Sequence, residues 1–288
     1  MPTIQDDEEY DKKVLTTKIG KICKKPADLH VIDYEKLAQK DPEEIAKLID
    51  AGKKSGMWYL DIRGPTARSI LEDVPTLFGP AMEYFQLPQN DPEKTSQVRP
   101  GLDRGFDCNG FARYYEIARD EYAQGKWVLP KLLEPIKDRI DCLMKLMNDV
   151  VHTQLVYLCN AVNLDIPELN DDPTHASHTA LKLLYKPPVH EVGGIVIDRH
   201  TDFGMMTLLW YDEVTTHIPV YDANGKELNI WQHVPVKEGH LLMNCSDDLE
   251  ARSNGQLHST VHRVICPPGP RRPKNGMVYL QRPYLDSQ

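Results

Sequence analysis

Two histidines and one aspartate of this chain have the residue types and spacing of a metal site. His200 and Asp202 form a His-x-Asp triplet, and His262 follows on a separate apolar segment. Residues i and i+2 of a β-strand point to the same face, so this imidazole and carboxylate would lie side by side in a strand. An imidazole from a second strand would complete the two-histidine, one-carboxylate ligand set of non-haem Fe(II) sites. The pattern predicts an iron site formed by His200, Asp202 and His262.

The other histidines and the cysteines offer no comparable cluster. The other histidines lack a partner at metal-ligand spacing and are interpreted as surface or packed residues, including His258, four residues before His262. The six cysteines are scattered and form no Cys-x-x-Cys pair. They predict free thiols in a reducing compartment, rather than a disulfide framework or a zinc site.

The metal residues fall in a part of the chain whose pattern is typical of β-structure. After about residue 178, short apolar and β-branched runs alternate with Gly, Pro, Asn and Asp. Residues 222–225, Asp-Ala-Asn-Gly, are a hairpin signal between two of these runs. Eight short strands at this spacing predict a jelly roll or barrel formed by residues 178–288. The expected strands are 181–185, 194–197, 205–210, 218–220, 230–236, 240–244, 261–266 and 277–280.

Residues 1–177 are expected to buttress this core as part of the same fold unit. Asp41 can cap a helix whose first turn contains Pro42 and two acidic residues, as the helix dipole favours. A longer stretch, 132–162, repeats apolar residues at steps of three and four, which predicts a core helix packed on a sheet. The other expected features are an arm with little structure at 1–28, strands at 31–33 and 57–62, a helix at 67–85 weakened by two prolines, and a long loop at 86–113.

The composition excludes several classes of protein without selecting a function. The chain has 288 residues and a net charge of −9, whereas a general nucleic-acid binder needs a basic face. A membrane span needs a run of about 18 apolar residues, and none occurs. The acidic start of the chain differs from a secretory signal peptide. We therefore expect a soluble cytoplasmic protein that binds neither nucleic acid nor membrane.

The segments around the triad resemble those of a known family. In order and over almost the whole chain, they are similar to the Fe(II)/2-oxoglutarate oxygenases of the isopenicillin N synthase-like branch. The resemblance rests on RHTDFGMMTLL (199–209), NCSDDL (244–249), SNG (253–255), STVHRV (259–264), LKLLYKPP (181–188) and, in the N-terminal cap region, SGMWYL (55–60). It implies a mainly β fold, a double-stranded β-helix buttressed by N-terminal helices, in which His200, Asp202 and His262 bind the iron.

The resemblance also implies the chemistry. In this family, 2-oxoglutarate and O2 bind at the iron, and decarboxylation of 2-oxoglutarate to succinate and CO2 drives oxidation of a substrate C–H bond. Hydroxylation, desaturation or ring closure can follow. We therefore expect an Fe(II)/2-oxoglutarate-dependent dioxygenase that acts on a small molecule. Specialised natural-product metabolism is the expected setting, and an amino acid is one candidate substrate.

One departure from the family concerns the binding of 2-oxoglutarate. Most members hold its distal carboxylate with an Arg-x-Ser pair after the second histidine. Here one alignment places Lys-Asn-Gly (274–276) at that position, and another places Arg-Pro-Lys (272–274) there. A tyrosine that often helps to bind the same carboxylate is replaced by Lys186. We expect Lys274 or Arg272, together with Lys186, to bind 2-oxoglutarate in an altered geometry.

This departure leaves other functions open. The enzyme could dispense with 2-oxoglutarate and take all electrons from its substrate, as isopenicillin N synthase does. The triad could also hold Zn2+ for hydrolysis, or the chain could bind a ligand without chemistry. Residues 251–285 contain six basic residues and no acidic one. That positive stretch suits a small dianion, so 2-oxoglutarate-dependent oxidation is the preferred function.

Three further residues are expected near the iron. Asn244 and Asp247 can organise the turn before the distal strand or accept the second N–H of a ligating histidine, which usually donates it to a nearby group. Phe203 is a candidate for the mouth of the pocket. Beside the iron, Lys186 would also suit a carboxylate of the substrate.

Overall fold

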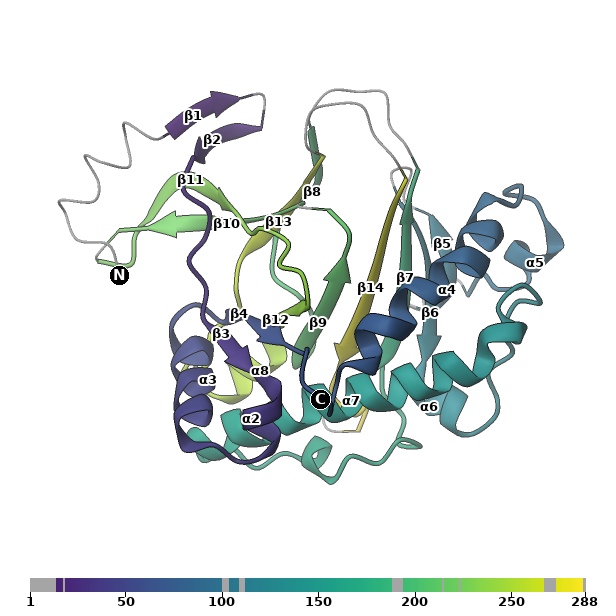
Figure 1. Ribbon diagram of the computed structural model, residues 1–288, viewed down its shortest axis with the longest axis horizontal. Coiled ribbons are helices and arrows are strands. Elements are labelled where there is room, and N and C mark those ends of the chain that lie inside the picture. The colour runs from purple at the N-terminus through teal and green to yellow at the C-terminus, as the bar shows by residue number, and fades with distance from the viewer. Residues whose placement is uncertain are drawn as a thin grey trace.

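Two β-sheets form the core of the chain (Figure 1). The computed structural model describes residues 14–17, 19–99, 104–108, 112–187, 194–213, 215–222, 224–266 and 273–286. The major sheet has the strand order β3-β4-β12-β9-β14-β7-β6-β5, and the minor sheet has the order β1-β2-β11-β10-β13-β8. Residues of both sheets line one cavity. The curled, mixed sheets form the jelly-roll double-stranded β-helix that the sequence predicts.

The eight strands expected after residue 178 are present, each within three residues of its expected ends. The alternating pattern located them because successive side chains of a strand face opposite sides of the sheet. β10 and β11 pair antiparallel across the expected hairpin, where the N–H of Asp222 donates to the carbonyl of Lys226 at 2.9 Å. The strands are β7 (Ala180–Lys186), β8 (Gly194–His200), β9 (Met206–Tyr211), β10 (Thr216–Tyr221), β11 (Glu227–His233), β12 (His240–Cys245), β13 (His262–Cys266) and β14 (Lys274–Gln281).

The expectation of a long loop at 86–113 is wrong. This segment contains α5 (Pro92–Thr95) and β5 (Gly105–Cys108), and it leads into β6 (Arg113–Ala118). β5 and β6 pair antiparallel, and β6 continues the major sheet beside β7. β5 is an edge strand whose surroundings are rich in turn residues, so it lacks the apolar alternation that reveals inner strands.

The N-terminal arm also carries more structure than expected. Within residues 1–28, β1 (Val14–Thr17) and β2 (Gly20–Cys23) pair antiparallel. β2 then adds to the minor sheet, where Ile22 is the parallel register partner of Trp231 in β11 (Figure 1). The hairpin was not predicted because the sequence of this arm is charged and aperiodic, and because its pairing is completed by a distant strand.

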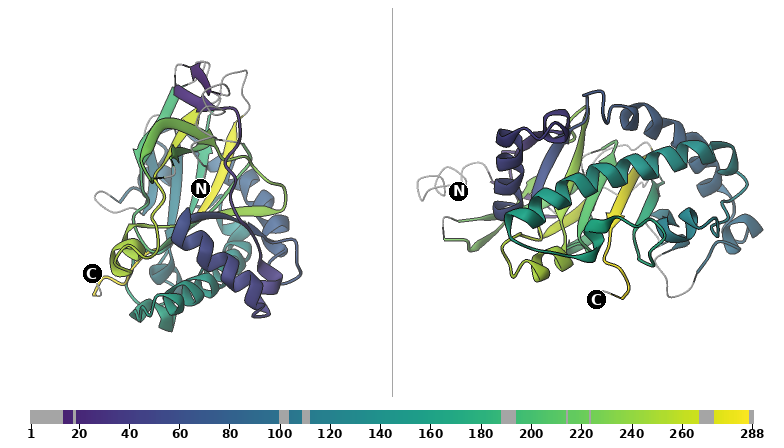
Figure 2. Two further views of the ribbon diagram at one scale, coloured as in Figure 1. Left: turned by 90° about the vertical axis from the view of Figure 1, so that its left-hand side faces the viewer. Right: turned by 90° about the horizontal axis from the view of Figure 1, so that it is seen from below.

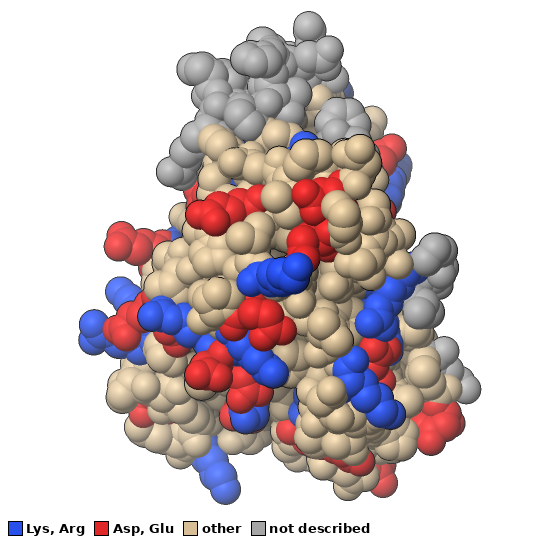
Figure 3. Space-filling model, turned by 90° about the vertical axis from the view of Figure 1, so that its right-hand side faces the viewer, with Lys and Arg blue, Asp and Glu red and all other residues tan. Residues whose placement is uncertain are grey.

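The β5–β7 side of the molecule, on the right in Figure 1, carries acidic and basic side chains that are interspersed over its surface (Figure 3). Several of the described charges on this side pair with each other. Nη1 of Arg99 lies 2.7 Å from Oε2 of Glu121, and Nη2 of Arg104 lies 3.4 Å from Oδ1 of Asp120. These ion pairs connect the region between α5 and β5 to the helix that follows β6.

Helices cover the outer face of the major sheet (Figure 2). α7 (Lys137–Ala161) runs across it beside α4 (Ser69–Gln86), and α3 (Pro42–Lys54) packs on one end of α7. The helix expected at 132–162 begins later because a 3-10 turn containing Pro135 precedes it. The helix expected at 67–85 is confirmed, with both prolines inside it. The other elements are β3 (Val31–Asp33), α2 (Tyr34–Ala38), β4 (Met57–Asp61), α6 (Arg119–Ala123), η1 (Glu134–Ile136), η2 (Pro167–Asn170) and α8 (Asp247–Arg252).

Two buried hydrogen bonds attach the major sheet to α7. The indole N–H of Trp58 in β4 donates to Gln154 at 2.8 Å, and the hydroxyl of Tyr279 in β14 donates to Asn148 at 2.9 Å. None of the helices in the described ranges is long and apolar enough to cross a membrane. Because α7 fixes the outer face of the sheet, the inner face is left to line the cavity.

Candidate metal centre and cavity

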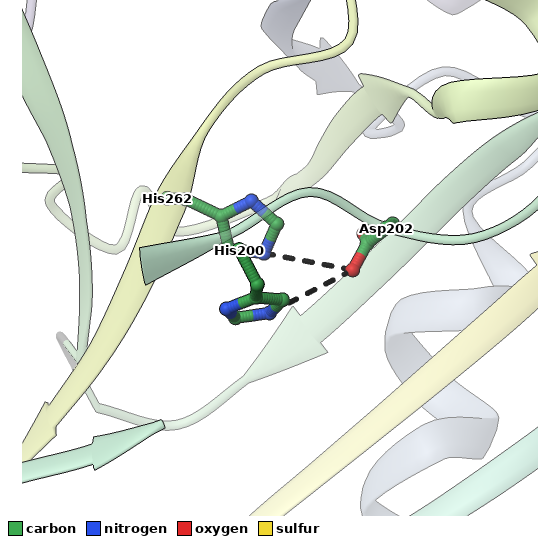
Figure 4. A group of neighbouring side chains, drawn as sticks. All are labelled: His200, Asp202 and His262. Carbon is green, nitrogen blue, oxygen red and sulfur yellow. Dashed lines mark ion pairs between the residues drawn. The ribbon is translucent and has the colours of Figure 1, made fainter. Parts of the chain in front are cut away.

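The two histidines of the predicted iron site lie opposite each other on neighbouring strands. His200 ends β8, His262 begins β13, and the two are register partners in the antiparallel pair. Their ring centroids are 4.3 Å apart. The sequence predicted that strand alternation would place Asp202 beside His200. Instead, β8 ends at His200, and Asp202 lies in the connection that follows. Figure 4 shows both rings facing its carboxylate.

Each histidine is held by a backbone carbonyl two residues before it. Nδ1 of His200 lies 2.7 Å from the carbonyl oxygen of Asp198, and Nδ1 of His262 lies 3.0 Å from that of Thr260. A carbonyl oxygen only accepts, so Nδ1 carries the proton and donates it in both rings. Nε2 is therefore left with a lone pair on each ring, as a metal ligand requires.

The three side chains form a donor set that fits Fe(II). The Nε2 atoms of His200 and His262 lie 3.9 and 3.6 Å from Oδ1 of Asp202. All three ligand atoms lie within 4.8 Å of one another. Two neutral imidazoles and one carboxylate are the ligand set of non-haem Fe(II) oxygenases, and they leave coordination positions open.

The carboxylate of Asp202 is oriented and kept ionised by its neighbours. Nδ2 of Asn244, in β12, donates to Oδ2 of Asp202 at 3.0 Å, on the carboxylate oxygen that does not face the histidines. Burial raises the pKa of Asp202, but the neighbouring His262 and the Asn244 hydrogen bond lower it by more, so the pKa lies below its usual value. The carboxylate is thus available as an anionic ligand.

Asp247 ties together the two segments that carry the triad. Its Oδ2 accepts a hydrogen bond from the hydroxyl of Thr201 at 2.9 Å, and its Oδ1 accepts one from Ser259 at 2.7 Å. Its backbone N–H also donates to the carbonyl of Asp202 at 3.0 Å. Asn244 and Asp247 therefore lie beside the triad, but neither accepts the Nδ1–H of a histidine, because backbone carbonyls take that role.

Replacing Asn244 with alanine is expected to weaken Fe(II) binding by about 10- to 100-fold, because the carboxylate of Asp202 loses the donor that orients it. Anaerobic Fe(II) titration measures the change. Asn160→Ala, at an exposed position of α7, is the matched control and should bind Fe(II) like the wild type. Wild-type affinity in Asn244→Ala would show that Asp202 needs no such support.

Phe203 does not have the position expected for it. Its side chain is 50% exposed, and it is absent from the residues that line the cavity. The guanidinium carbon of Arg282 lies 5.8 Å from the centre of its ring. In the connection after β8, Asp202 rather than Phe203 faces the cavity, so the expectation that Phe203 lines the pocket mouth is wrong.

The triad lines a cavity of about 300 Å³ that also contains two expected lysines. Lys186 ends β7, Lys274 begins β14, and the two are register partners. Nζ of Lys274 lies 3.0 Å from Oε2 of Glu213. Burial, and next the charge of Lys274, lower the pKa of Lys186 to about 8. The structure thus brings Lys186 and Lys274 together, while Arg272 lies outside the described residues.

Sequence reasoning missed two other side chains in this cavity. Lys182 and Tyr114 line it, from β7 and β6. Lys182 lies in the expected strand 181–185, four residues before Lys186, and strand alternation places residues four apart on the same face. That spacing was the available signal for Lys182. No comparable signal existed for Tyr114, because the segment before it was interpreted as a loop.

The comparison with known families agrees with this geometry. The model of the 2OG-Fe(II) oxygenase superfamily matches residues 177–275, which contain the whole triad. Residues 177–275 are thus a 2OG-Fe(II) oxygenase domain. With this domain, the chain is an oxidoreductase that uses Fe(II), 2-oxoglutarate and O2, and the alternatives of a 2-oxoglutarate-independent oxidase or a hydrolase are not favoured.

Relatives of the oxygenase are known in sequence and in structure. It is 23% identical to a 2-oxoglutarate-dependent dioxygenase of Gibberella zeae, covering 83% of this chain and 74% of that one. It is 26% identical to the oxidoreductase VrtI of Penicillium aethiopicum, with 83% of this chain and 60% of that one covered. The dioxygenase for auxin oxidation of Arabidopsis thaliana, solved with 2-oxoglutarate, has a TM-score of 0.68 at 18% identity and covers 89% of this chain and 93% of that chain.

A further structural neighbour comes from a fungus. The full-length Neurospora crassa protein solved with alpha-KG and thymine has a TM-score of 0.67 at 20% identity, covering 88% of this chain and 85% of that chain. These structural similarities show that the oxygenase has the same fold as both neighbours. The double-stranded β-helix expected from the sequence is thereby confirmed.

Proposed function

We propose that this oxygenase oxidises a C–H bond of a small organic molecule, with Fe(II) bound by His200, Asp202 and His262. The observation that carries this proposal is the convergence of both Nε2 atoms on one carboxylate at the wall of a cavity. When bound there, Fe(II) supplies the redox chemistry by which O2 oxidises 2-oxoglutarate to succinate and CO2 and attacks the substrate.

The protein residues have separate tasks in this reaction. The carbonyls of Asp198 and Thr260 keep both imidazoles in the tautomer that offers Nε2. Asn244 holds Asp202 so that one carboxylate oxygen faces the histidines. The apolar side chains of the cavity, such as Leu209 and Val264, exclude water from the reacting groups.

We further propose that Lys274 and Lys186 bind the distal carboxylate of 2-oxoglutarate. Their register pairing directs two ammonium groups into the cavity from adjacent strands. Lys274 pairs with Glu213, and among the described residues no carboxylate lies within ion-pair distance of Lys186. Lys186, Lys274 and Glu213 together therefore carry a net charge of +1, which one carboxylate would neutralise.

The names of relatives support a small molecule as substrate. A homoarginine-6-hydroxylase of Glycine max and a coumaroyl and feruloyl CoA ortho-hydroxylase of Ipomoea batatas are among them, each 26% identical or less. The Neurospora crassa structure contains thymine. A kihadalactone A synthase of Citrus sinensis, 23% identical to this chain, supports a setting in specialised metabolism.

Anaerobic titration with Fe(II) and 2-oxoglutarate tests the proposed function directly. The protein should bind Fe(II), and adding 2-oxoglutarate should produce the weak visible metal-to-ligand band. Admitting O2 should then yield succinate. Absence of the band and of succinate in Fe(II)-loaded protein would contradict the proposal, whereas product formation without succinate would return the choice to a 2-oxoglutarate-independent oxidase.

Binding of 2-oxoglutarate should weaken at alkaline pH. Only the ammonium form of Lys186 attracts the distal carboxylate, and this form is lost as the pH rises through its pKa of about 8. The KM for 2-oxoglutarate should therefore be constant below that pH and rise by about tenfold toward pH 9.5. Succinate formation at several pH values measures this rise.

The matched variant for the pH experiment is Lys186→Arg. A guanidinium stays protonated over the whole range, so the alkaline rise in KM should disappear. A wild-type KM that stays constant up to pH 9.5 would remove Lys186 from the 2-oxoglutarate site.

A further inference from the structure

Strand β7 presents two lysines to the cavity from the same side. Lys182, Leu184 and Lys186 all line it, as residues i, i+2 and i+4 of one strand do. A strand rises about 3.3 Å per residue, so the Cα atoms of the two lysines are roughly 13 Å apart. Lys182 and Lys186 therefore occupy two distinct positions along one wall of the cavity.

Lys182 lies nearer to the level of the triad than Lys186 does. Register partners relate the triad to a position on β7. Asn244, which donates to Asp202, is the first residue of a row that crosses the major sheet through Thr207 and Leu280 to Ala180 of β7. Lys182 is two residues from the β7 end of this row, and Lys186 is six residues from it. A group bound by Lys182 would thus lie at the triad end of the cavity.

The ammonium group of Lys182 is held in a fixed position. Its Nζ lies 2.6 Å from Oε2 of Glu116, the register partner of Lys182 on β6, and 5.6 Å from the centre of the Tyr114 ring. The side chain of Glu116 is 4% exposed, and its other oxygen accepts a hydrogen bond from Arg282 at 3.0 Å. One carboxylate thus contacts two cations, and Glu116 takes only one of the three N–H donors of Lys182.

The cavity that Lys182 lines also has apolar walls. Val196 and Ile197 of β8 and Val278 and Leu280 of β14 line the same space. A cation fixed among apolar side chains attracts an anion more strongly than a cation in water does, because the local dielectric is lower. The position suits a ligand with a carboxylate and an apolar body.

We infer that the substrate of this oxygenase is an organic acid with an apolar body, whose carboxylate is bound by Lys182. Lys186 and Lys274 then remain for 2-oxoglutarate, so substrate and cosubstrate are held by different lysines of the same wall. The inference rests on the proposed function, because it places the substrate in the cavity of the triad. Lys182 acts in specificity, by orienting the acid relative to the iron.

Matched acids and amides test the inference. Phenylacetate, cinnamate and hexanoate, each beside its neutral amide, are titrated calorimetrically into anaerobic protein loaded with Fe(II) and 2-oxoglutarate, and into protein loaded with Fe(II) alone. In the wild type, at least one acid should bind about tenfold more tightly than its amide, the usual effect of a charge-assisted hydrogen bond. Lys182→Met should reduce the preference to less than twofold, and Lys182→Arg should retain it.

Lys145→Met, which removes an exposed lysine of α7, is the control for loss of a positive charge and should keep the preference. Equal binding of every acid and its amide in the wild type would overturn the inference, whatever the variants do. A preference that persists in Lys182→Met would overturn the assignment to Lys182. The visible band formed by wild-type protein with Fe(II) and 2-oxoglutarate reports separately on the proposed function. Failure of the inference about the substrate can therefore be distinguished from failure of the proposed function.

Discussion

Replacing His262 with alanine is expected to abolish Fe(II) binding and succinate formation, with a loss of more than about a thousandfold in turnover. His262 supplies one of only two imidazoles of the triad, and its Nε2 lies 3.6 Å from Oδ1 of Asp202. Alanine leaves one imidazole and one carboxylate, which do not make the three-ligand set of this class of iron site. Anaerobic Fe(II) titration and succinate measurement give the two readouts.

The control for this variant is His258→Ala, four residues earlier in the same segment. Nδ1 of His258 contacts Glu250 at 3.0 Å, and the residue does not belong to the group of possible metal ligands. Its loss should leave Fe(II) binding intact, since an exposed ion pair contributes little to stability. Normal Fe(II) affinity in a folded His262→Ala protein would exclude His262 as a ligand. Loss of affinity in both variants would instead indicate damage to the segment.

The core of the fold could be predicted because its strands obey simple rules. In β7 and β9 the side chains that line the cavity alternate with side chains that face the other way, which is the period of two expected of a strand. α7 could be predicted in a similar way, because its apolar residues recur at helical spacing and pack on the major sheet. β2 was not predicted because its place in the minor sheet depends on a distant strand, β11, in which Trp231 is its register partner. β5 was not predicted because it is an edge strand among turn residues.

The site could be predicted only where its residues belong to a recognisable sequence pattern. A His-x-Asp triplet occurs often by chance, so the triad was identified from its spacing together with the surrounding segments that resemble the family. The conformation of the connection after β8 could not be derived from the sequence, because hydrogen bonds to Asp247, a residue of the distant helix α8, determine it. For this reason the position predicted for Phe203 was wrong. Lys182 was overlooked because lysines are common on strands, and only the partner strand shows that Glu116 holds it toward the cavity.

Replacing Lys274 with methionine is expected to raise the KM for 2-oxoglutarate by about a hundredfold. The variant keeps the buried stem but removes a charge-assisted hydrogen bond to the distal carboxylate, which is worth about 1.5–3 kcal/mol. It also leaves Glu213 without its ammonium partner, so a negative charge beside the cavity repels the dianion. Lys274→Arg keeps the charge and should stay close to the wild type. Succinate formation at varied 2-oxoglutarate concentration measures KM.

Glu213→Gln separates this explanation from a loss of structure. In the native protein Glu213 competes with 2-oxoglutarate for Lys274, since its Oε2 lies 3.0 Å from Nζ. Removing its charge should therefore lower the KM for 2-oxoglutarate, the opposite of the change in Lys274→Met, whereas general damage would raise KM in both. Lys226→Met, at an exposed position before β11, is the control for loss of a lysine and should change nothing. An unchanged KM in Lys274→Met would shift the assignment to the alignment that uses Arg272, and a raised KM in Glu213→Gln would contradict competition for the lysine.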